Sequence, residues 1–213
     1  MSAIYKNNIL SGKIHESLED PVSGVFYDMS QWVAPYLYEI GVTPNMITTI
    51  RLMLIIIGFG YFFENGHYRT AATLFLLSYF GDCLDGHMAR KYDMDTVFGD
   101  YYDHIADILT YIIVIYYTAT NIDLEYDWVV LLIFMILILS LIQVGCEERY
   151  LKLMGVDKNS KMMSSTTGLC PKSLIADSEL ESLMEVSRLF GMGVYVLLST
   201  VLIWNFEAFE TRE

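Results

Sequence analysis

The stretch WVVLLIFMILILSLIQVG, residues 128–145, is uncharged from end to end. A helix of roughly 20 predominantly apolar residues crosses the hydrocarbon core of a bilayer, and this stretch approaches that length. Two further stretches, TPNMITTIRLMLIIIGFGYFF (43–63) and LFGMGVYVLLSTVLIW (189–204), have the same character. The whole chain has 213 residues, of which 54% are hydrophobic, and a mean hydropathy of +0.39. These features predict an all-α, polytopic membrane helical bundle.

Apolar runs at about 70–90 and 98–120 bring the number of clear predicted spans to five. Residues 146–180 are polar and contain Pro171, so we expect a broken loop there, unless it holds a short or re-entrant sixth segment. The residues ESLMEVSR (181–188) are expected to extend the last helix outward into water. The prediction is a bundle of five to six transmembrane helices.

The chain before the first span has a different composition. Residues 1–20 are polar, lack the apolar core of a signal peptide, and are expected to be mobile. In FYDMSQWVAPYLYEIGV (26–42), apolar residues recur at helical spacing beside Trp32 and several tyrosines, which is typical of an amphipathic helix at a membrane surface. A water-facing helix is the alternative. We therefore expect a polar segment with an interfacial helix over 1–42 and a transmembrane domain over 43–213.

The formal charge of −13 argues against nucleic acid or anionic lipid as the main partner. Both bind through clusters of lysine and arginine, which a strongly acidic chain does not favour. The cysteines Cys83, Cys146 and Cys170 are odd in number and far apart in the sequence. We expect them to be reduced thiols that face the cytosol or the membrane.

Lysine and arginine in the short loops predict the orientation, because they are retained on the cytoplasmic side. The connection at 121–127 has none. The segment 146–180 carries several, and Arg90 and Lys91 follow the second span. This alternation predicts a multi-pass protein with a cytoplasmic N-terminus and with residues 90–98 on the cytoplasmic side.

Carboxylates gather at that end of the bundle, in GDCLDGHMARKYDMDTVFGDYYDHIAD (81–107). Asp82 and Asp85 are three residues apart, and Asp103 and Asp107 are four apart, so each pair lies on one face of its helix. The connection at 91–98 is short, so the two helices are antiparallel neighbours whose acidic faces can converge. A buried, unpaired carboxylate is costly, so these four side chains need a partner.

A divalent metal would resolve the repulsion among four converging carboxylates. Hard oxygen ligands favour Mg²⁺, Mn²⁺ or Ca²⁺ over zinc, and four carboxylates are enough for two ions about 4 Å apart. Gly86 and Ala89 leave room beside the backbone, Arg90 offers a planar cation for phosphate, and Gly99 opens the facing helix. The combination indicates a pocket for a nucleoside diphosphate, although each glycine alone is also compatible with close helix packing.

Read together, Asp82–x–x–Asp85–Gly86–x–x–Ala89–Arg90, eight residues, Gly99–x–x–x–Asp103–x–x–x–Asp107 resembles the signature of the CDP-alcohol phosphatidyltransferase family. The resemblance implies an enzyme that displaces CMP from a CDP-linked donor with an alcohol hydroxyl, using Mg²⁺ or Mn²⁺. It implies that Asp82, Asp85 and Asp103 bind metal and that Asp107 is the general base and touches a metal. It also implies a possible homodimer, and six spans where we count five.

The resemblance further implies that the nucleotide is bound by Gly86, Ala89, Arg90 and Gly99. TPNMITTIR (43–51) resembles the start of the family's first helix, which adds Asn45 and Thr48 to the expected nucleotide contacts.

The donor and acceptor remain open. His104 after the third aspartate, and EDPVSGVFYDMSQW (19–32), resemble the enzymes that transfer from CDP-choline or CDP-ethanolamine to diacylglycerol. The position of Arg51 instead resembles that of an arginine in enzymes that use CDP-diacylglycerol with an anionic acceptor. We favour this second interpretation, in which Arg51 binds the acceptor. An arginine that snorkels to the interface is the alternative for Arg51.

Other readings concern the histidines and the class of protein. His87 and His104 are expected to be structural neighbours of the site and not proton carriers. An ion transporter also places acids in the membrane, but it needs them near the midplane and spread over several helices. A membrane prenyltransferase would also bind a diphosphate through metal ions. Such enzymes typically carry two acidic motifs on distant segments, whereas this sequence has one compact motif.

Overall fold

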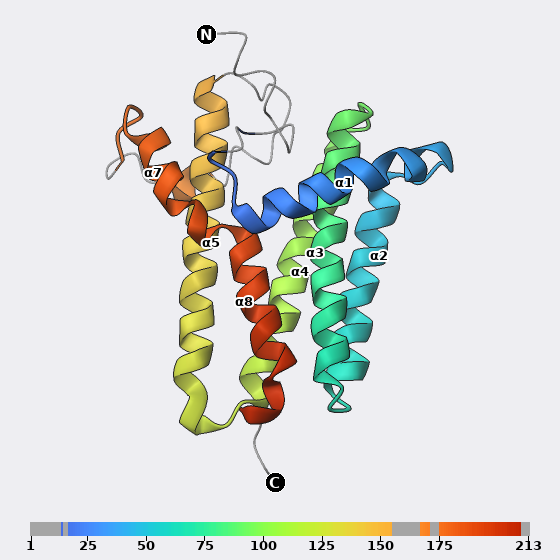
Figure 1. Cartoon of the computed structure of the whole chain (residues 1–213), viewed down its shortest axis with the longest axis vertical. Coiled ribbons are helices and arrows are strands. Elements are labelled where there is room, and N and C mark those ends of the chain that lie inside the picture. Colours follow the sequence, from blue (N-terminus) through green and yellow to red (C-terminus); the bar gives the residue numbers. More distant parts are fainter. Residues whose placement is uncertain (1–13, 15–16, 155–166, 171–174, 210–213) are drawn as a thin grey trace.

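The computed structural model describes residues 14, 17–154, 167–170 and 175–209. Within these ranges the chain forms helices and turns and contains no strand. Long helices stand side by side, and one helix crosses them near one end (Figure 1). The predicted all-α membrane bundle is confirmed.

Seven α-helices follow one another in the described residues: α1 (Pro21–Glu39), α2 (Pro44–Ile57), α3 (Tyr68–Lys91), α4 (Val97–Asn121), α5 (Asp127–Met154), α7 (Leu180–Ser187) and α8 (Met192–Trp204). A wider π-helical stretch, Gly58–Phe63, prolongs α2. Single 3-10 turns occur at Leu124–Tyr126, Thr167–Leu169, Arg188–Phe190 and Phe206–Ala208.

Three helical segments of the described chain are long and apolar enough to cross a membrane: Pro44–Phe63, Trp128–Met154 and Leu180–Trp204. The helices α3 and α4, which we also predicted as spans, are 24 and 25 residues long but carry the acidic motif. Large apolar side chains are exposed on α2, α4 and α5, and surfaces of this kind suit contact with lipid; examples are Met53, Ile112 and Met135. The count of five to six spans stays a prediction.

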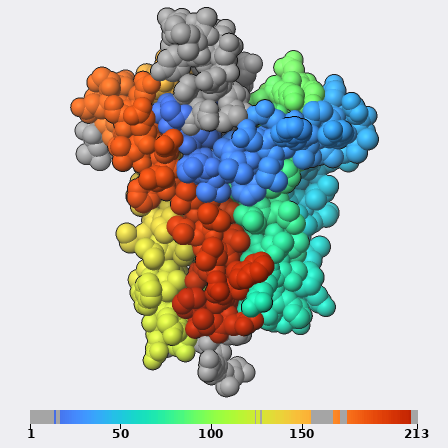
Figure 2. All heavy atoms as spheres, in the orientation of Figure 1, coloured from blue at the N-terminus to red at the C-terminus, as the bar shows by residue number. Residues whose placement is uncertain are grey.

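The helix that crosses the bundle is α1 (Figures 1 and 2). Its inner face packs on α3, where the ring of Phe26 lies 5.6 Å from that of Tyr79 and 6.0 Å from that of Phe80. Trp32 and Tyr36 point outward and are 78% and 70% exposed. The described part of the chain therefore leaves an aromatic, apolar face of α1 uncovered, which suits a helix that lies at a membrane surface.

Asp20 fixes the start of both α1 and α8. Its Oδ1 accepts hydrogen bonds from the backbone N–H groups of Val22 and Ser23, at 2.7 and 3.0 Å, and its Oδ2 accepts one from Val194 at 3.0 Å. A side-chain oxygen at a helix N-terminus satisfies donors that the helix itself leaves unpaired. For this reason α1 begins at Pro21, earlier than expected, and α8 begins anew after Gly191.

The chain near α8 differs from expectation in two places. The segment 181–188 precedes the last span as expected, but a 3-10 turn and Gly191 separate this helix, α7, from α8, where Asp20 caps the latter. The residues just before α1 are not a free polar tail, since Leu18 and Asp20 are both buried. Residues 1–13 and 15–16 lie outside the described part.

The helix α5 continues to Met154, past the expected end of the span at residue 145. Its last turns bury Cys146 and Tyr150 against Leu18 and against α7. Burial of these residues keeps α5 helical as far as Met154, in a segment where composition alone predicts a broken loop. Of the possible sixth segment within 150–180, residues 155–166 and 171–174 lie outside the described part.

Cys146 and Cys170 form a disulfide, so the expectation of three reduced thiols is wrong for these two. The partners are 24 residues apart in sequence and 4.9 Å apart between Cα atoms. The fold of α5 onto the 167–170 turn brings them together, and the sequence contains no spacing that signals it. Cys83 is a free, buried thiol on α3.

Candidate active site

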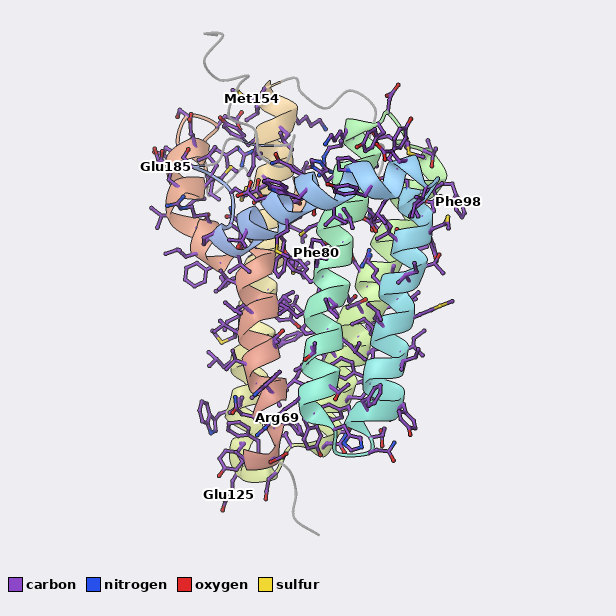
Figure 3. The ribbon with its side chains drawn as sticks, turned by 45° about the vertical axis from the view of Figure 1, so that its right-hand side comes forward. Arg69, Phe80, Phe98, Glu125, Met154 and Glu185 are labelled. Carbon is purple, nitrogen blue, oxygen red and sulfur yellow. A yellow bond between two sulfur atoms is a disulfide. The ribbon has the colours of Figure 1, made fainter. Side chains whose placement is uncertain are left out.

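The site is built from one end of α2, α3 and α4. Thr43 and Thr96 cap α2 and α4, the latter by accepting a hydrogen bond from the Gly99 N–H at 3.0 Å. The hydroxyls of Thr49 and Tyr102 lie 2.9 Å apart and link α2 to α4. Figure 3 shows this end of the bundle at the level of Phe98, with Arg69 and Glu125 at the opposite end.

The acidic faces of α3 and α4 meet. One carboxylate oxygen from each of Asp82, Asp85 and Asp103 lies within 4.8 Å of the others, so these three could hold a metal ion. The Asp85 side chain is only 3% exposed, whereas those of Asp82, Asp103 and Asp107 are 26%, 33% and 31% exposed. Asp85 thus forms the floor of the site, and the other three remain open to solvent.

Arg51 of α2 lies among all four aspartates. Its contacts are Nη2 with Asp82 Oδ1 at 3.1 Å and with Asp103 Oδ1 at 2.5 Å, Nε with Asp85 Oδ2 at 3.3 Å, and Nη1 with Asp107 Oδ1 at 2.9 Å. The residue is only 2% exposed. The snorkelling interpretation is therefore wrong, because the guanidinium points inward. Binding of an acceptor by Arg51 stays a prediction, and it requires the guanidinium to leave this position.

Thr48 supports the floor of the site. Its hydroxyl lies 2.7 Å from Asp85 Oδ2, to which it donates, and it also lies within reach of the Pro44 carbonyl at 3.1 Å. We expected Thr48 to contact nucleotide. In the structure it is buried and orients a carboxylate, and its contact with nucleotide stays a prediction.

Two of the other residues expected to contact nucleotide are glycines, and each faces a polar side chain. Asn45 lies against Gly99: a Cβ at that glycine would be 3.0 Å from Asn45 Oδ1. The guanidinium of Arg90 folds over Gly86, where a Cβ would be 3.2 Å from Nη1. Ala89 lies one turn after Asp85 on α3 and is partly exposed. The two glycines therefore leave space that polar side chains now fill.

The histidines stand apart from the four aspartates. His104 Nδ1 lies 2.8 Å from the backbone carbonyl of Asp100, one turn earlier in α4. His87 is buried on α3, and its Nε2 has no hydrogen-bond partner among the described residues. Neither histidine contacts Arg51 or an aspartate of the cluster through any ion pair found in the described chain.

A small cavity of about 10 Å³ lies behind the cluster, between Asp82, Asp107 and α8. That volume accommodates about one water molecule. Ser78, Thr110 and Tyr111 line it, and sequence analysis did not single them out. Thr110 could have been found by continuing the Asp103–Asp107 face by one more turn along α4.

The donor set matches a hard divalent cation. Four carboxylates and the Thr48 hydroxyl meet around one guanidinium, and these hard oxygen donors disfavour soft metal ions. Mg²⁺, Mn²⁺ and Ca²⁺ prefer such oxygens. The site can thus take a metal ion at the same oxygens that Arg51 now contacts.

Comparison with known proteins gives a consistent result. The sequence model of the CDP-alcohol phosphatidyltransferase family matches residues 41–204, which is most of the chain. A CDP-diacylglycerol–glycerol-3-phosphate 3-phosphatidyltransferase of Rickettsia felis is 36% identical over 84 residues, covering 38% of this chain and 46% of that protein. Proteins of the same name from Pseudomonas fluorescens and Cereibacter sphaeroides are 38% identical over 68 residues and 27% identical over 155 residues.

The matched lengths differ among these relatives. The Pseudomonas fluorescens match covers 31% of this chain and 35% of the relative, and the Cereibacter sphaeroides match covers 68% of each. The chain thus matches less than half the length of the first two relatives.

Proposed function

Because the chain belongs to the CDP-alcohol phosphatidyltransferase family, we propose that it transfers a phosphatidyl group from CDP-diacylglycerol to a hydroxyl of glycerol 3-phosphate and releases CMP. The observation that carries the proposal is the meeting of Asp82, Asp85 and Asp103, from two helices, within 4.8 Å. Such a cluster suits the binding of metal-bound diphosphate at one end of a membrane bundle.

The choice of CDP-diacylglycerol over CDP-choline or CDP-ethanolamine rests on two supports. Several relatives of the chain are CDP-diacylglycerol–glycerol-3-phosphate 3-phosphatidyltransferases. Arg51 supplies a buried cation beside the cluster, which an anionic acceptor can use once the guanidinium leaves the aspartates and which diacylglycerol does not need. The alternative is transfer of an aminoalcohol phosphate to diacylglycerol, and measurement of CMP release from each donor distinguishes the two reactions.

We assign Asp82, Asp85, Asp103 and Asp107 as the residues that would hold Mg²⁺ or Mn²⁺, with two ions. When bound, such ions neutralise the diphosphate of the donor and stabilise the departing CMP. Asp85 is held by Thr48 and is the most enclosed of the four, so it fixes the depth at which the donor diphosphate lies.

In the proposed reaction, Asp107 accepts the proton of the acceptor hydroxyl. The oxygen of that hydroxyl forms a new bond to the phosphorus that bears the diacylglycerol, while the bond from that phosphorus to the oxygen of CMP breaks. The proton ends on the Asp107 carboxylate, whose side chain is 31% exposed and open to an entering acceptor. Asn45, Gly86, Ala89, Arg90 and Gly99 form the proposed surroundings of the cytidine diphosphate.

We further propose that the protein is an integral membrane enzyme whose site faces the cytoplasm, on the basis of Arg90, Lys91 and the basic residues after α5. The Cys146–Cys170 disulfide at the same end is an opposing signal, because cytosolic disulfides are rare outside hyperthermophiles. A reporter fused after residue 91 would give a cytoplasmic signal under this proposal and an external one if the orientation is reversed.

The substrate assignment is tested on purified protein in lipid nanodiscs with Mg²⁺. Each donor, CDP-diacylglycerol, CDP-choline or CDP-ethanolamine, is offered with glycerol 3-phosphate or diacylglycerol, and CMP is measured. We expect CMP only from CDP-diacylglycerol with glycerol 3-phosphate. Release from CDP-choline and diacylglycerol would establish the alternative. No release from any pair, together with Mn²⁺ uptake into sealed vesicles, would favour the transporter reading.

A further inference from the structure

One arginine occupies the place that a cation would take in the proposed site. Arg51 contacts one carboxylate oxygen of each of the four aspartates, and it is buried while doing so. We propose that Arg51 is an internal counter-cation: it holds the four carboxylates together before metal binds, and it must give them up when a divalent ion enters. This inference rests on the metal site of the proposed function and goes beyond it.

Arg51 and a bound metal ion would use the same carboxylates. Nη2 of Arg51 lies between Asp82 Oδ1 and Asp103 Oδ1, at 3.1 and 2.5 Å. The carboxylates of these two residues, with that of Asp85, are the group that comes within 4.8 Å and could hold a metal. The arginine and a divalent ion therefore compete for the same carboxylates.

The packing of α2 against α3 holds the Arg51 side chain in place. Gly81 of α3 lets α2 approach closely, since a Cβ there would be 3.1 Å from Arg51 Cβ. Nη2 also lies 3.3 Å from the backbone carbonyl of Asp103. The stem of Arg51 is thus fixed between α2 and α3, so the guanidinium reaches the cluster without a change in the helices.

Electrostatic attraction keeps Arg51 among the carboxylates in the metal-free protein. Four carboxylates this close raise one another's energy when ionised, and a buried arginine without partners is costly as well. In the metal-free protein, the guanidinium offsets the repulsion among the carboxylates, and the carboxylates offset the cost of burying the guanidinium. A divalent ion carries more charge than the guanidinium and repels it at this distance, so both cannot keep the same contacts.

Coupling of this kind is reciprocal: what the arginine contributes to the metal-free site is subtracted from the free energy of metal binding. Removal of the guanidinium should therefore raise the affinity for metal while it lowers the free energy of unfolding of the metal-free protein. If Arg51 had only a packing role, its removal would lower the free energy of unfolding without raising the affinity for metal.

The test measures binding of Mn²⁺ to the full-length purified protein by the EPR signal of free Mn²⁺, without substrate. Arg51→Gln is compared with the wild type, and Arg69→Gln is the matched control, because Arg69 is an exposed arginine at the far end of α3 (Figure 3). We expect Arg51→Gln to bind Mn²⁺ about tenfold more tightly, within the range of ordinary coupling. Arg69→Gln should bind as the wild type does.

Thermal unfolding supplies the second readout. In EDTA, Arg51→Gln should unfold at a lower temperature than the wild type, and added Mn²⁺ should raise its unfolding temperature by more than it raises that of the wild type. If Arg51→Gln does not fold, Arg51→Lys serves, since lysine keeps the charge but loses the planar fork. We expect it to show a smaller gain in Mn²⁺ affinity.

Unchanged or weaker Mn²⁺ binding by the folded variant would overturn the inference. Asp82→Asn separates this failure from failure of the proposed function. If the wild type binds Mn²⁺ and Asp82→Asn does not, the metal site stands, and only the role of Arg51 is decided by the arginine variants. If the wild type binds no Mn²⁺, the metal site and the inference about Arg51 are both wrong.

Discussion

The hydroxyl of Thr48 donates a hydrogen bond to Oδ2 of Asp85 across the contact between α2 and α3, at 2.7 Å. Asp85 is the most buried of the four aspartates, and Arg51 contacts the same oxygen at 3.3 Å. The carboxylate is therefore oriented from α2 by two donors, one neutral and one charged. Thr48 therefore orients a carboxylate of the cluster, and its expected contact with nucleotide stays a prediction.

Thr48→Val should lower the affinity for Mn²⁺ by about 10- to 100-fold, because partners that orient a metal ligand contribute that much. Valine keeps the shape of threonine and removes the hydroxyl. Thr48→Ser, which keeps the hydroxyl, should stay near the wild type. Mn²⁺ titration without nucleotide checks the prediction. Normal Mn²⁺ affinity with weakened binding of the CDP-linked donor would restore the nucleotide role.

Gly193→Ala should destabilise the protein at the junction of α1 and α8. A Cβ at this position would lie 2.7 Å from the backbone nitrogen of Ser23 and 2.8 Å from Asp20 Oδ1, so one of the two helices must shift. Overpacking of this kind costs about 1–3 kcal/mol. The unfolding temperature in detergent checks it.

Gly24→Ala is the control for that variant. Gly24 lies inside α1, and a Cβ there would have nothing within 4 Å. Since alanine favours a helix over glycine by about 1 kcal/mol, this variant should unfold at the same or a higher temperature. Equal unfolding temperatures for Gly193→Ala and the wild type would show that the junction is looser than described.

Cys146→Ser should lower the free energy of unfolding by about 3 kcal/mol, the loop-closure contribution expected for partners 24 residues apart. Cys170→Ser and the double variant should lower it equally, because either change removes the same bond. A reductant should bring the wild type to the same unfolding temperature. If the reductant changes nothing and both thiols react with an alkylating reagent, these cysteines are reduced, as the sequence alone led us to expect.

The sequence was informative where one helix determines the outcome. The spans expected at 70–90 and 98–120 correspond to α3 (Tyr68–Lys91) and α4 (Val97–Asn121). Spacing alone places Asp82 with Asp85 on one face, and the short connection makes the two helices neighbours. The approach of the acidic faces follows from these local facts.

The sequence was uninformative where a contact depends on how helices are turned against each other. The inward position of Arg51 depends on the rotation of α2 and on its close approach to Gly81, neither of which apolar periodicity specifies. The disulfide and the double capping by Asp20 join segments 24 and 174 residues apart in sequence. Such pairs arise from tertiary packing, so inspection of either partner alone could not reveal them.

The central claim is that the aspartate cluster promotes release of CMP, with Asp107 taking the proton of the acceptor. The most direct measurement is the rate of CMP release from CDP-diacylglycerol and glycerol 3-phosphate by Asp107→Asn, with binding of the donor and of Mn²⁺ measured in parallel. Asp100→Asn is the control, because Asp100 lies on the same helix and contacts His104 but none of the cluster. We predict that Asp107→Asn still binds the donor while CMP release falls by about 10²- to 10⁴-fold, and that Asp100→Asn stays near the wild-type rate. A wild-type rate of CMP release by Asp107→Asn would contradict the account.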